Sequence, residues 1–131
     1  MAERIDLEMP ATLNALSTVR MVLGGLGARL DFSLDDLDDL YLATDGLLRS
    51  ALDADPLDRL SVEILIDNGV LRFAAGTFKS AKLRADVTLH AEDCIVDLCI
   101  LLRRTVDEVL FEDADGAYRV VLIKRRQDAP A

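Results

Sequence analysis

Few side chains in this sequence have the types and spacing that chemistry at a protein site requires. The 131 residues contain one histidine, His90, and two cysteines, Cys94 and Cys99. The cysteines form no Cys-x-x-Cys pair, and one histidine does not complete a usual zinc set, so we expect no metal site. Both cysteines are predicted to be small core residues of a chain that folds in a reducing cytoplasm. The five serines stand at no recognisable triad spacing from His90, although a triad is defined in space rather than in sequence.

Carboxylates are abundant, and their number sets the charge of the chain. The sequence has 24 Asp and Glu against 15 Lys and Arg, a formal net charge of −9. This charge repels phosphate, so we expect neither nucleic acid nor an anionic membrane as a partner, and a basic protein surface is more compatible. The cluster Asp35, Asp36, Asp38 and Asp39 is predicted to be a solvated helix face, because calcium would need a glycine-turned loop. The one basic run, Lys124–Arg126, is interpreted as the solubilising end of a strand.

Length and hydropathy indicate one domain, residues 1–131, with an aliphatic core. The N-terminal residues do not resemble a signal peptide, and no apolar run approaches the roughly 20 residues of a membrane helix. We therefore expect a cytoplasmic protein.

Hydrophobic periodicity predicts the elements that position any site. Alternation of apolar and polar residues predicts strands over 4–9, 61–66, 70–74, 109–112 and 118–123. Apolar residues at three- and four-residue steps predict helices over 11–30, from Ser33 to about residue 55, and over 92–104. Asn68-Gly69 and the stretch 113–116 predict two hairpins, whereas 75–86 has no clear pattern.

Two local signals refine the helices. The stretch Ser33–Asp36 resembles a capping box, in which the serine hydroxyl bonds the Asp36 amide. Gly24, Gly25 and Gly27 lie inside the first helix, where no strand leads into them and no Gly-Lys-Ser/Thr follows, so a phosphate loop is disfavoured. We expect these glycines to let another helix or subunit approach closely.

The order strand, helix, helix, hairpin, loop, helix, hairpin predicts an α+β two-layer sandwich, a mostly antiparallel sheet with helices on one face. This order and three stretches resemble the GHKL (Bergerat-fold) ATPase domain of bacterial anti-sigma-factor serine/threonine kinases. The stretches are 15–20 with 28–33, 36–45, and 102–109 with 118–125. The resemblance covers nearly the whole chain and implies a sigma factor or an anti-anti-sigma protein as partner. It also implies a homodimer formed through residues 4–9 and the glycine-bearing helix, and Mg-ATP as cofactor if the nucleotide site survives.

The positions that match the family's helical nucleotide motif are degenerate. The family's catalytic glutamate falls on Gly46, which has no side chain to act as a base. The asparagine that holds magnesium one helical turn later falls on Ser50, a weaker ligand. The resemblance therefore implies no catalytic residue in this chain and leaves Ser50 as a remnant of cofactor binding.

The other nucleotide motifs are degenerate as well. Residues 73–78 take the place of the Asp-x-Gly-x-Gly motif that binds adenine, and only Gly76 and Thr77 remain as candidate cofactor-binding residues. The phosphate-binding glycine pair falls on Ile95 and Asp97, and a carboxylate would repel a triphosphate.

The leading hypothesis is thus a regulatory protein-binding domain, a degenerate kinase that is not an enzyme. Gly46 is interpreted as the remnant of a catalytic position, although close helix packing also explains it. The alternative is a working serine/threonine kinase that uses Asp45 as base and Ser50 as magnesium ligand. Asp45 is about 100° around the helix from Gly46, which counts against this alternative. A third reading is a small-molecule sensor with an apolar pocket.

Overall fold

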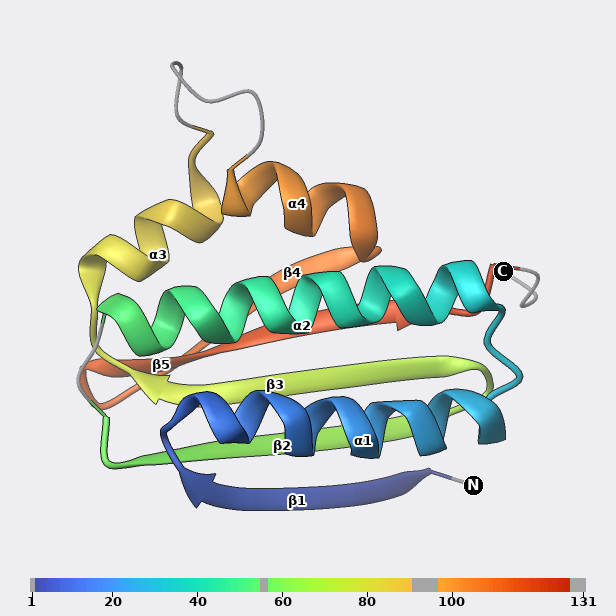
Figure 1. The fold of residues 1–131 in the computed structure, drawn as a ribbon. Coiled ribbons are helices and arrows are strands. Elements are labelled where there is room, and N and C mark those ends of the chain that lie inside the picture. The colour runs from blue at the N-terminus through green and yellow to red at the C-terminus, as the bar shows by residue number, and fades with distance from the viewer. Residues whose placement is uncertain (1, 55–56, 91–96, 128–131) are drawn as a thin grey trace.

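The computed structural model describes residues 2–54, 57–90 and 97–127, and Figure 1 shows their arrangement. Within these residues, five strands form one antiparallel sheet in the order β1-β2-β3-β5-β4, and four helices lie on one of its faces. The strands are β1 (Glu3–Pro10), β2 (Arg59–Asp67), β3 (Val70–Phe78), β4 (Glu108–Ala114) and β5 (Ala117–Arg125). The helices are α1 (Leu13–Arg29), α2 (Leu34–Ala54), α3 (Ala81–Thr88) and α4 (Leu98–Thr105). The predicted α+β two-layer sandwich is confirmed.

Both predicted hairpins are confirmed. Asn68 and Gly69 have φ of 50° and 77°, and Asp115 and Gly116 have φ of 54° and 78°. Two central residues with positive φ give a turn whose twist matches that of antiparallel strands, and Asn-Gly and Asp-Gly tolerate this conformation best. The turns therefore fix the registers of β2 with β3 and of β4 with β5.

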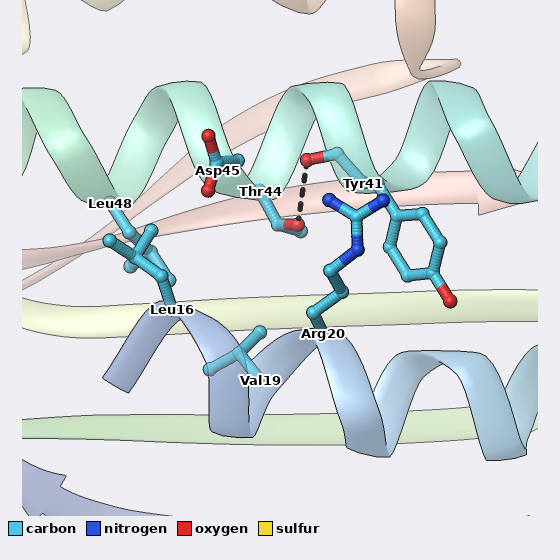
Figure 2. Close-up of a pocket in the computed structure, with 7 residues that line it drawn as sticks. All are labelled: Leu16, Val19, Arg20, Tyr41, Thr44, Asp45 and Leu48. Carbon is cyan, nitrogen blue, oxygen red and sulfur yellow. Dashed lines mark hydrogen bonds between the residues drawn. The ribbon is translucent and has the colours of Figure 1, made fainter. Parts of the chain in front are cut away.

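The first two helices lie side by side on the sheet, and Figure 2 shows Arg20 of α1 close to Tyr41 of α2. Two of the three predicted close-approach glycines face α2. A Cβ on Gly24 would lie 2.7 Å from Tyr41 Oη, and one on Gly27 would lie 2.9 Å from Leu37 Cδ1. Gly25 is on the solvent side of α1, where a Cβ would meet nothing within 4 Å, so none of the described helices of this chain approaches it, and the approach of another subunit there stays a prediction.

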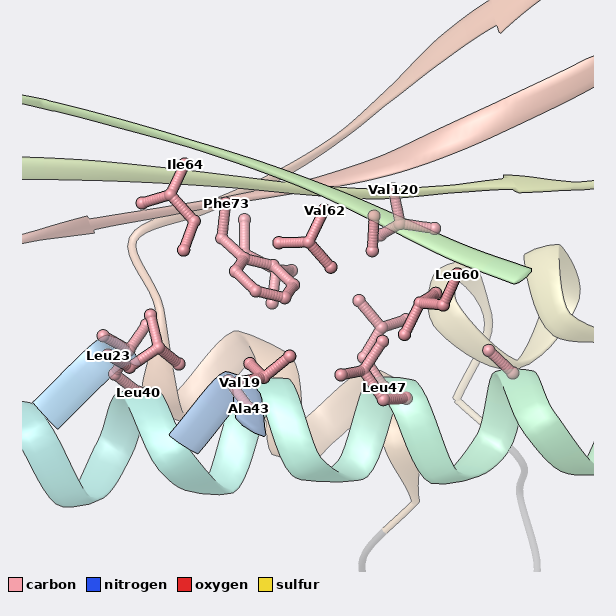
Figure 3. Packing of buried hydrophobic residues seen from close by; sticks show 14 of the residues in the cluster. Val19, Leu23, Leu40, Ala43, Leu47, Leu60, Val62, Ile64, Phe73 and Val120 are labelled. Carbon is pink, nitrogen blue, oxygen red and sulfur yellow. The ribbon is translucent and has the colours of Figure 1, made fainter. Parts of the chain in front are cut away.

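The core lies between the helices and the inner face of the sheet, as Figure 3 shows. Its members alternate along the strands and recur at three- and four-residue steps along α1 and α2. Fully buried examples are Leu23, Leu40, Leu47, Ile64 and Phe73. Most of these side chains are aliphatic, as composition predicted, so the stability of the fold comes mainly from apolar area removed from water.

The N-terminus of α2 is fixed by a hydrogen bond and by buried charges. The Asp36 amide donates to Ser33 Oγ at 3.0 Å, so the predicted capping contact is confirmed. The Asp36 side chain is buried, and Lys124 Nζ lies 3.8 Å from Asp36 Oδ1 and 3.6 Å from Asp39 Oδ2. The expectations of a solvated Asp36 and a solubilising Lys124 are therefore wrong, because the alternation of β5 directs Lys124 inward, towards the first turns of α2.

Two regions differ from the sequence prediction. The unassigned stretch 75–86 contains the end of β3 and the start of α3, whose Leu83 amide donates to Ser80 Oγ at 3.1 Å. The last helix begins at Leu98 rather than at residue 92, because Asp97 caps it by accepting from the Ile100 amide at 2.9 Å. Residues 92–96, and with them the predictions for Cys94 and Ile95, lie outside the described residues.

The outer face of the sheet carries a ladder of ion pairs with one member from each strand. In sheet order these are Arg4, Glu63, Arg72, Arg119 and Glu112. Glu63 lies 2.9 Å from Arg4 and 3.4 Å from Arg72, and Glu112 pairs with both Arg72 and Arg119. Charges of opposite sign on neighbouring strands stabilise a sheet and disfavour a shifted register.

The ladder also explains how small apolar residues on this face are buried. Ala74 and Val121 point away from the helices, yet both are fully buried. Arginine stems commonly lie along apolar surface while their charged ends stay in water. We therefore attribute the burial of Ala74 and Val121 to the side chains of the ladder and its neighbours.

The ladder predicts a pH-dependent stability. The hydrogen bond from Arg119, assisted by Arg72, holds the pKa of Glu112 below its ordinary value. A lowered carboxyl pKa stabilises the fold above the unfolded-state pKa, and this contribution is lost as the pH falls through the lower folded-state value. Glu112→Gln is expected to lower the free energy of unfolding near neutral pH by up to about 1 kcal/mol and to have a smaller effect near pH 3. Urea titrations at both pH values measure this, and an equal loss at the lower pH would contradict it.

Candidate functional site

Gly46, which the resemblance predicts to take the place of the family's catalytic base, lies on the face of α2 that meets α4. A Cβ on Gly46 would be 2.6 Å from Leu101 Cδ2 and 3.7 Å from Leu98 Cδ1. The first distance is shorter than real Cβ contacts allow, so any side chain here requires Leu101 to move. The described surroundings of Gly46 are therefore apolar side chains in direct contact with the helix backbone.

Hydrogen bonds and burial hold α4 in this position. Asp97 caps the first turn of α4, and Cys99 and Leu102 are buried on the inner side of this helix. The Cys99 thiol donates to the carbonyl of Thr88 at 3.5 Å, which joins the start of α4 to the end of α3. The prediction of a buried core cysteine is confirmed for Cys99, and the contact at Gly46 is a consequence of a well-anchored helix.

Asp97 matches one of the family's phosphate-binding glycines, and its carboxylate already has two partners. Oδ1 accepts from the Ile100 amide, and Oδ2 lies 2.7 Å from His90 Nδ1. An aspartate at this point offers negative charge where a triphosphate would need positive charge or bare backbone amides. The residue type and its contacts therefore suit a helix cap.

Gly76, a candidate adenine-site remnant, packs against β5. A Cβ on Gly76 would lie 3.0 Å from the carbonyl oxygen of Tyr118 and 3.0 Å from Arg119 Cγ. The register of β3 with β5 shifts between Ala75 and Phe78, so the two backbones approach closely here. The neighbouring Thr77 is exposed. Strand packing thus gives a sufficient physical reason for glycine at this position.

Asp45 and Ser50, the residues of the alternative kinase hypothesis, occupy different surroundings. Asp45 Oδ2 accepts from Arg49 Nε at 2.8 Å and lines a hollow between α1 and α2. It therefore faces α1 rather than α4, as its angular offset from Gly46 predicted. Ser50, one turn beyond Gly46, is half-buried near the end of α2.

The hollow between α1 and α2, shown in Figure 2, was not predicted from the sequence. Arg20 and Tyr41 form its centre, with the Arg20 guanidinium carbon 4.3 Å from the centroid of the Tyr41 ring. Leu16, Val19 and Leu48 close the inner part of the hollow. The only sequence signal was that Arg20 and Tyr41 each stand at the edge of the apolar face of a predicted helix. This signal does not reveal that the two helix faces lie next to each other at these residues.

Two further properties concern metals and membranes. Across residues 2–54, 57–90 and 97–127, no three His, Cys, Asp or Glu side chains are grouped as metal ligands. The helices within these ranges include none with the length and apolar character needed to cross a bilayer.

Comparisons with known proteins support the fold. No protein-family model and no curated protein match the chain. The fold is similar to the crystal structure of the RsbU and RsbW domains of Rv1364c from Mycobacterium tuberculosis, with a TM-score of 0.65 and 18% sequence identity. The alignment covers 94% of this chain and 32% of that chain, so this chain spans about a third of its length. At this identity the likeness concerns the fold, and it agrees with the resemblance that element order and hydrophobic pattern suggested.

The contact between Gly46 and Leu101 predicts strong coupling between these residues. Gly46→Leu is expected to lower the free energy of unfolding by about 2–3 kcal/mol, because the new side chain overlaps Leu101. Adding Leu101→Ala opens space for it, so the loss in the double variant should be smaller than the sum of the single losses by at least about 1 kcal/mol. Urea unfolding of the four proteins measures the coupling.

Gly25→Leu is the matched control. It makes the same change in the middle of a helix, but nothing lies within 4 Å of the new Cβ. Helix propensity should then stabilise the chain by up to about 1 kcal/mol. Additive losses at Gly46 and Leu101, or equal effects of leucine at Gly46 and Gly25, would contradict the packing role of Gly46.

Proposed function

We propose that this protein is a regulatory protein-binding domain that resembles an anti-sigma factor and lacks the family's kinase site. The observation that carries the proposal is the contact of Leu101 with the backbone at Gly46. A kinase of this family needs a carboxylate base at that position, held beside the phosphates. In this chain Gly46 has no side chain, and the apolar residues Leu98 and Leu101 of α4 occupy the adjacent space.

Two other positions support the same conclusion. Asp97 places a carboxylate where the family has a phosphate-binding glycine, and both of its oxygens have partners within the chain. Gly76 is explained by the approach of β3 to β5. Gly46, Gly76 and Asp97 thus each have a structural explanation, and this supports the proposal that the site no longer suits Mg-ATP.

The alternative, a working serine/threonine kinase, finds less support. Its base would be Asp45, whose carboxylate is paired with Arg49 and directed towards α1. A base on that side of α2 would be separated by the helix itself from a ligand near Gly46 and α4. Ser50 alone supplies one neutral oxygen, which is a poor magnesium site.

The partner class follows from the resemblance and from charge. We propose a sigma factor or an anti-anti-sigma protein, met in the cytoplasm. The net charge of −9 disfavours nucleic acid and favours a partner with a basic contact surface.

Titration calorimetry with magnesium-ATP and, separately, with ADP tests the proposed loss of the site. We expect no heat of binding at high micromolar protein and no change of the melting temperature, because ligands that bind only the folded state raise it. Magnesium-dependent binding that is abolished by Ser50→Ala would contradict the proposal and favour the kinase alternative. A phosphotransfer assay would then be the next measurement.

We also propose that the protein forms a homodimer through β1 and the adjoining side of α1. Among the described strands, β1 is an edge strand that pairs only with β2. Arg29 of α1 pairs with Glu3 of β1, and Thr18, three turns earlier, is exposed on the same helix face. Thr18→Arg is expected to convert a dimer to a monomer in sedimentation equilibrium without lowering the melting temperature. A monomeric parent chain, or a dimer unaffected by Thr18→Arg, would contradict this interface.

A further inference from the structure

The outward side of α1 carries no charge over its whole length. The residues are Leu13, Ser17, Met21, Gly25 and Ala28, which follow one another at steps of three or four and are all exposed. Leu13 is 64% exposed and Met21 is 78% exposed. In a chain with 30% charged residues, the solvent side of a surface helix is expected to be polar. An uncharged, partly apolar side is therefore a candidate surface for contact with another protein.

This side of α1 borders two adjoining shallow hollows between α1 and α2, together termed the groove, which share Arg20 and Tyr41. Ser17, Met21 and Gly24 line it from α1. Asp38, Leu42 and Asp45 line it from α2, and Leu42 is 53% exposed. The stacked pair of Arg20 and Tyr41 lies between the walls and lines both halves of the groove.

The two walls differ in charge. The exposed part of α2 carries Asp35, Asp38 and Asp53 and the paired Asp45 and Arg49, whereas Asp36 and Asp39 share one cation, Lys124. The α2 wall is therefore acidic, and the outward side of α1 is neutral. Arg20 is the one cation that lines the groove in the described residues, and it is held against the Tyr41 ring.

We infer that the groove between α1 and α2 binds an amphipathic helix of a partner protein. The apolar stripe of this helix would contact Met21 and Leu42, and its basic side would face α2. The inference rests on the proposed partner-binding function and specifies the surface and the chemistry of the partner. Apolar residues at helical spacing are how a helix is recognised in a groove, and opposite charges set its orientation.

A second copy of this chain fits the groove less well. Each copy has a net charge of −9 and the same acidic α2, so a contact between two such faces brings like charges together. The homodimer proposed above uses the flank of α1 next to β1, which adjoins this side at Thr18 and Gly25 but does not include the α2 wall with Asp38 and Leu42.

The test uses a synthetic probe of defined chemistry, because the charge and spacing are specified and the partner is not. The probe is a fluorescein-labelled peptide of about 18 residues, five turns of helix, with leucine at helical spacing and lysine elsewhere. Fluorescence anisotropy with the full chain should show saturable binding. Met21→Gln and Leu42→Gln should each weaken binding at least about fivefold, and Asp38→Asn should reduce its salt dependence.

Leu110→Gln is the matched control, because Leu110 is 45% exposed on β4, away from the groove. It should leave binding unchanged, and a peptide with glutamate in place of lysine should not bind. The inference is overturned by absence of binding, by equal binding of the acidic peptide, or by an equal effect of Leu110→Gln. It is also overturned if Met21→Gln dissociates a dimer of the chain, since the groove then holds a second copy. None of these outcomes alters the calorimetric result with nucleotide, so the proposed loss of the nucleotide site is judged separately.

Discussion

The close approach of α4 to the backbone of α2 at Gly46 is the constraint on which the site depends. Helices usually pack with their axes 8–10 Å apart, and the shorter distances require small residues at the crossing. Gly46 removes the Cβ that would otherwise collide with Leu101. A mid-helix glycine lowers the stability of a helix by roughly 1 kcal/mol relative to alanine. Glycine is therefore expected at such a position where the packing that it permits stabilises the fold by at least this amount. Leu102 and Cys99, which α4 buries on its inner side, contribute to this stabilisation.

The same principle joins α1 to α2, and buried charge then fixes where α2 begins. Gly24 and Gly27 admit Tyr41 and Leu37, so small residues on one helix receive large residues from the next. At the start of α2, Lys124 lies between Asp36 and Asp39 with little exposure. A buried ion pair contributes little net stability, but removing one partner leaves an uncompensated charge. We interpret this cluster as a device that fixes the position of α2 along β5, and so decides which residue of α2 meets α4.

Much of the fold could be predicted because it depends on local signals. Strands with one buried face alternate, and Asn68-Gly69 specifies its own turn, so four of the five strands were found to within a few residues of their observed bounds. The exception is β3, whose end falls in the unassigned stretch 75–86. There Gly76 and the register shift interrupt the alternation, and the short α3 has few apolar residues. Lys124 was misjudged for a different reason, since its partners are distant in sequence and only the sheet brings them together.

The candidate site shows where sequence reasoning reaches its limit. From the sequence, Gly46 was interpreted as the remnant of a catalytic position, and close packing stayed compatible, because both explanations require only the absence of a side chain. The structure adds the identity of the neighbour, Leu101. The missing side chain at Gly46 does not by itself predict that a leucine packs against the helix there. The two explanations are compatible with each other. Once a catalytic side chain is lost, the space beside it no longer needs to accommodate a nucleotide, and apolar residues that fill it lower the free energy of the fold. A glutamate introduced at position 46 would have to displace the end of the Leu101 side chain before it could reach any ligand on that side of α2.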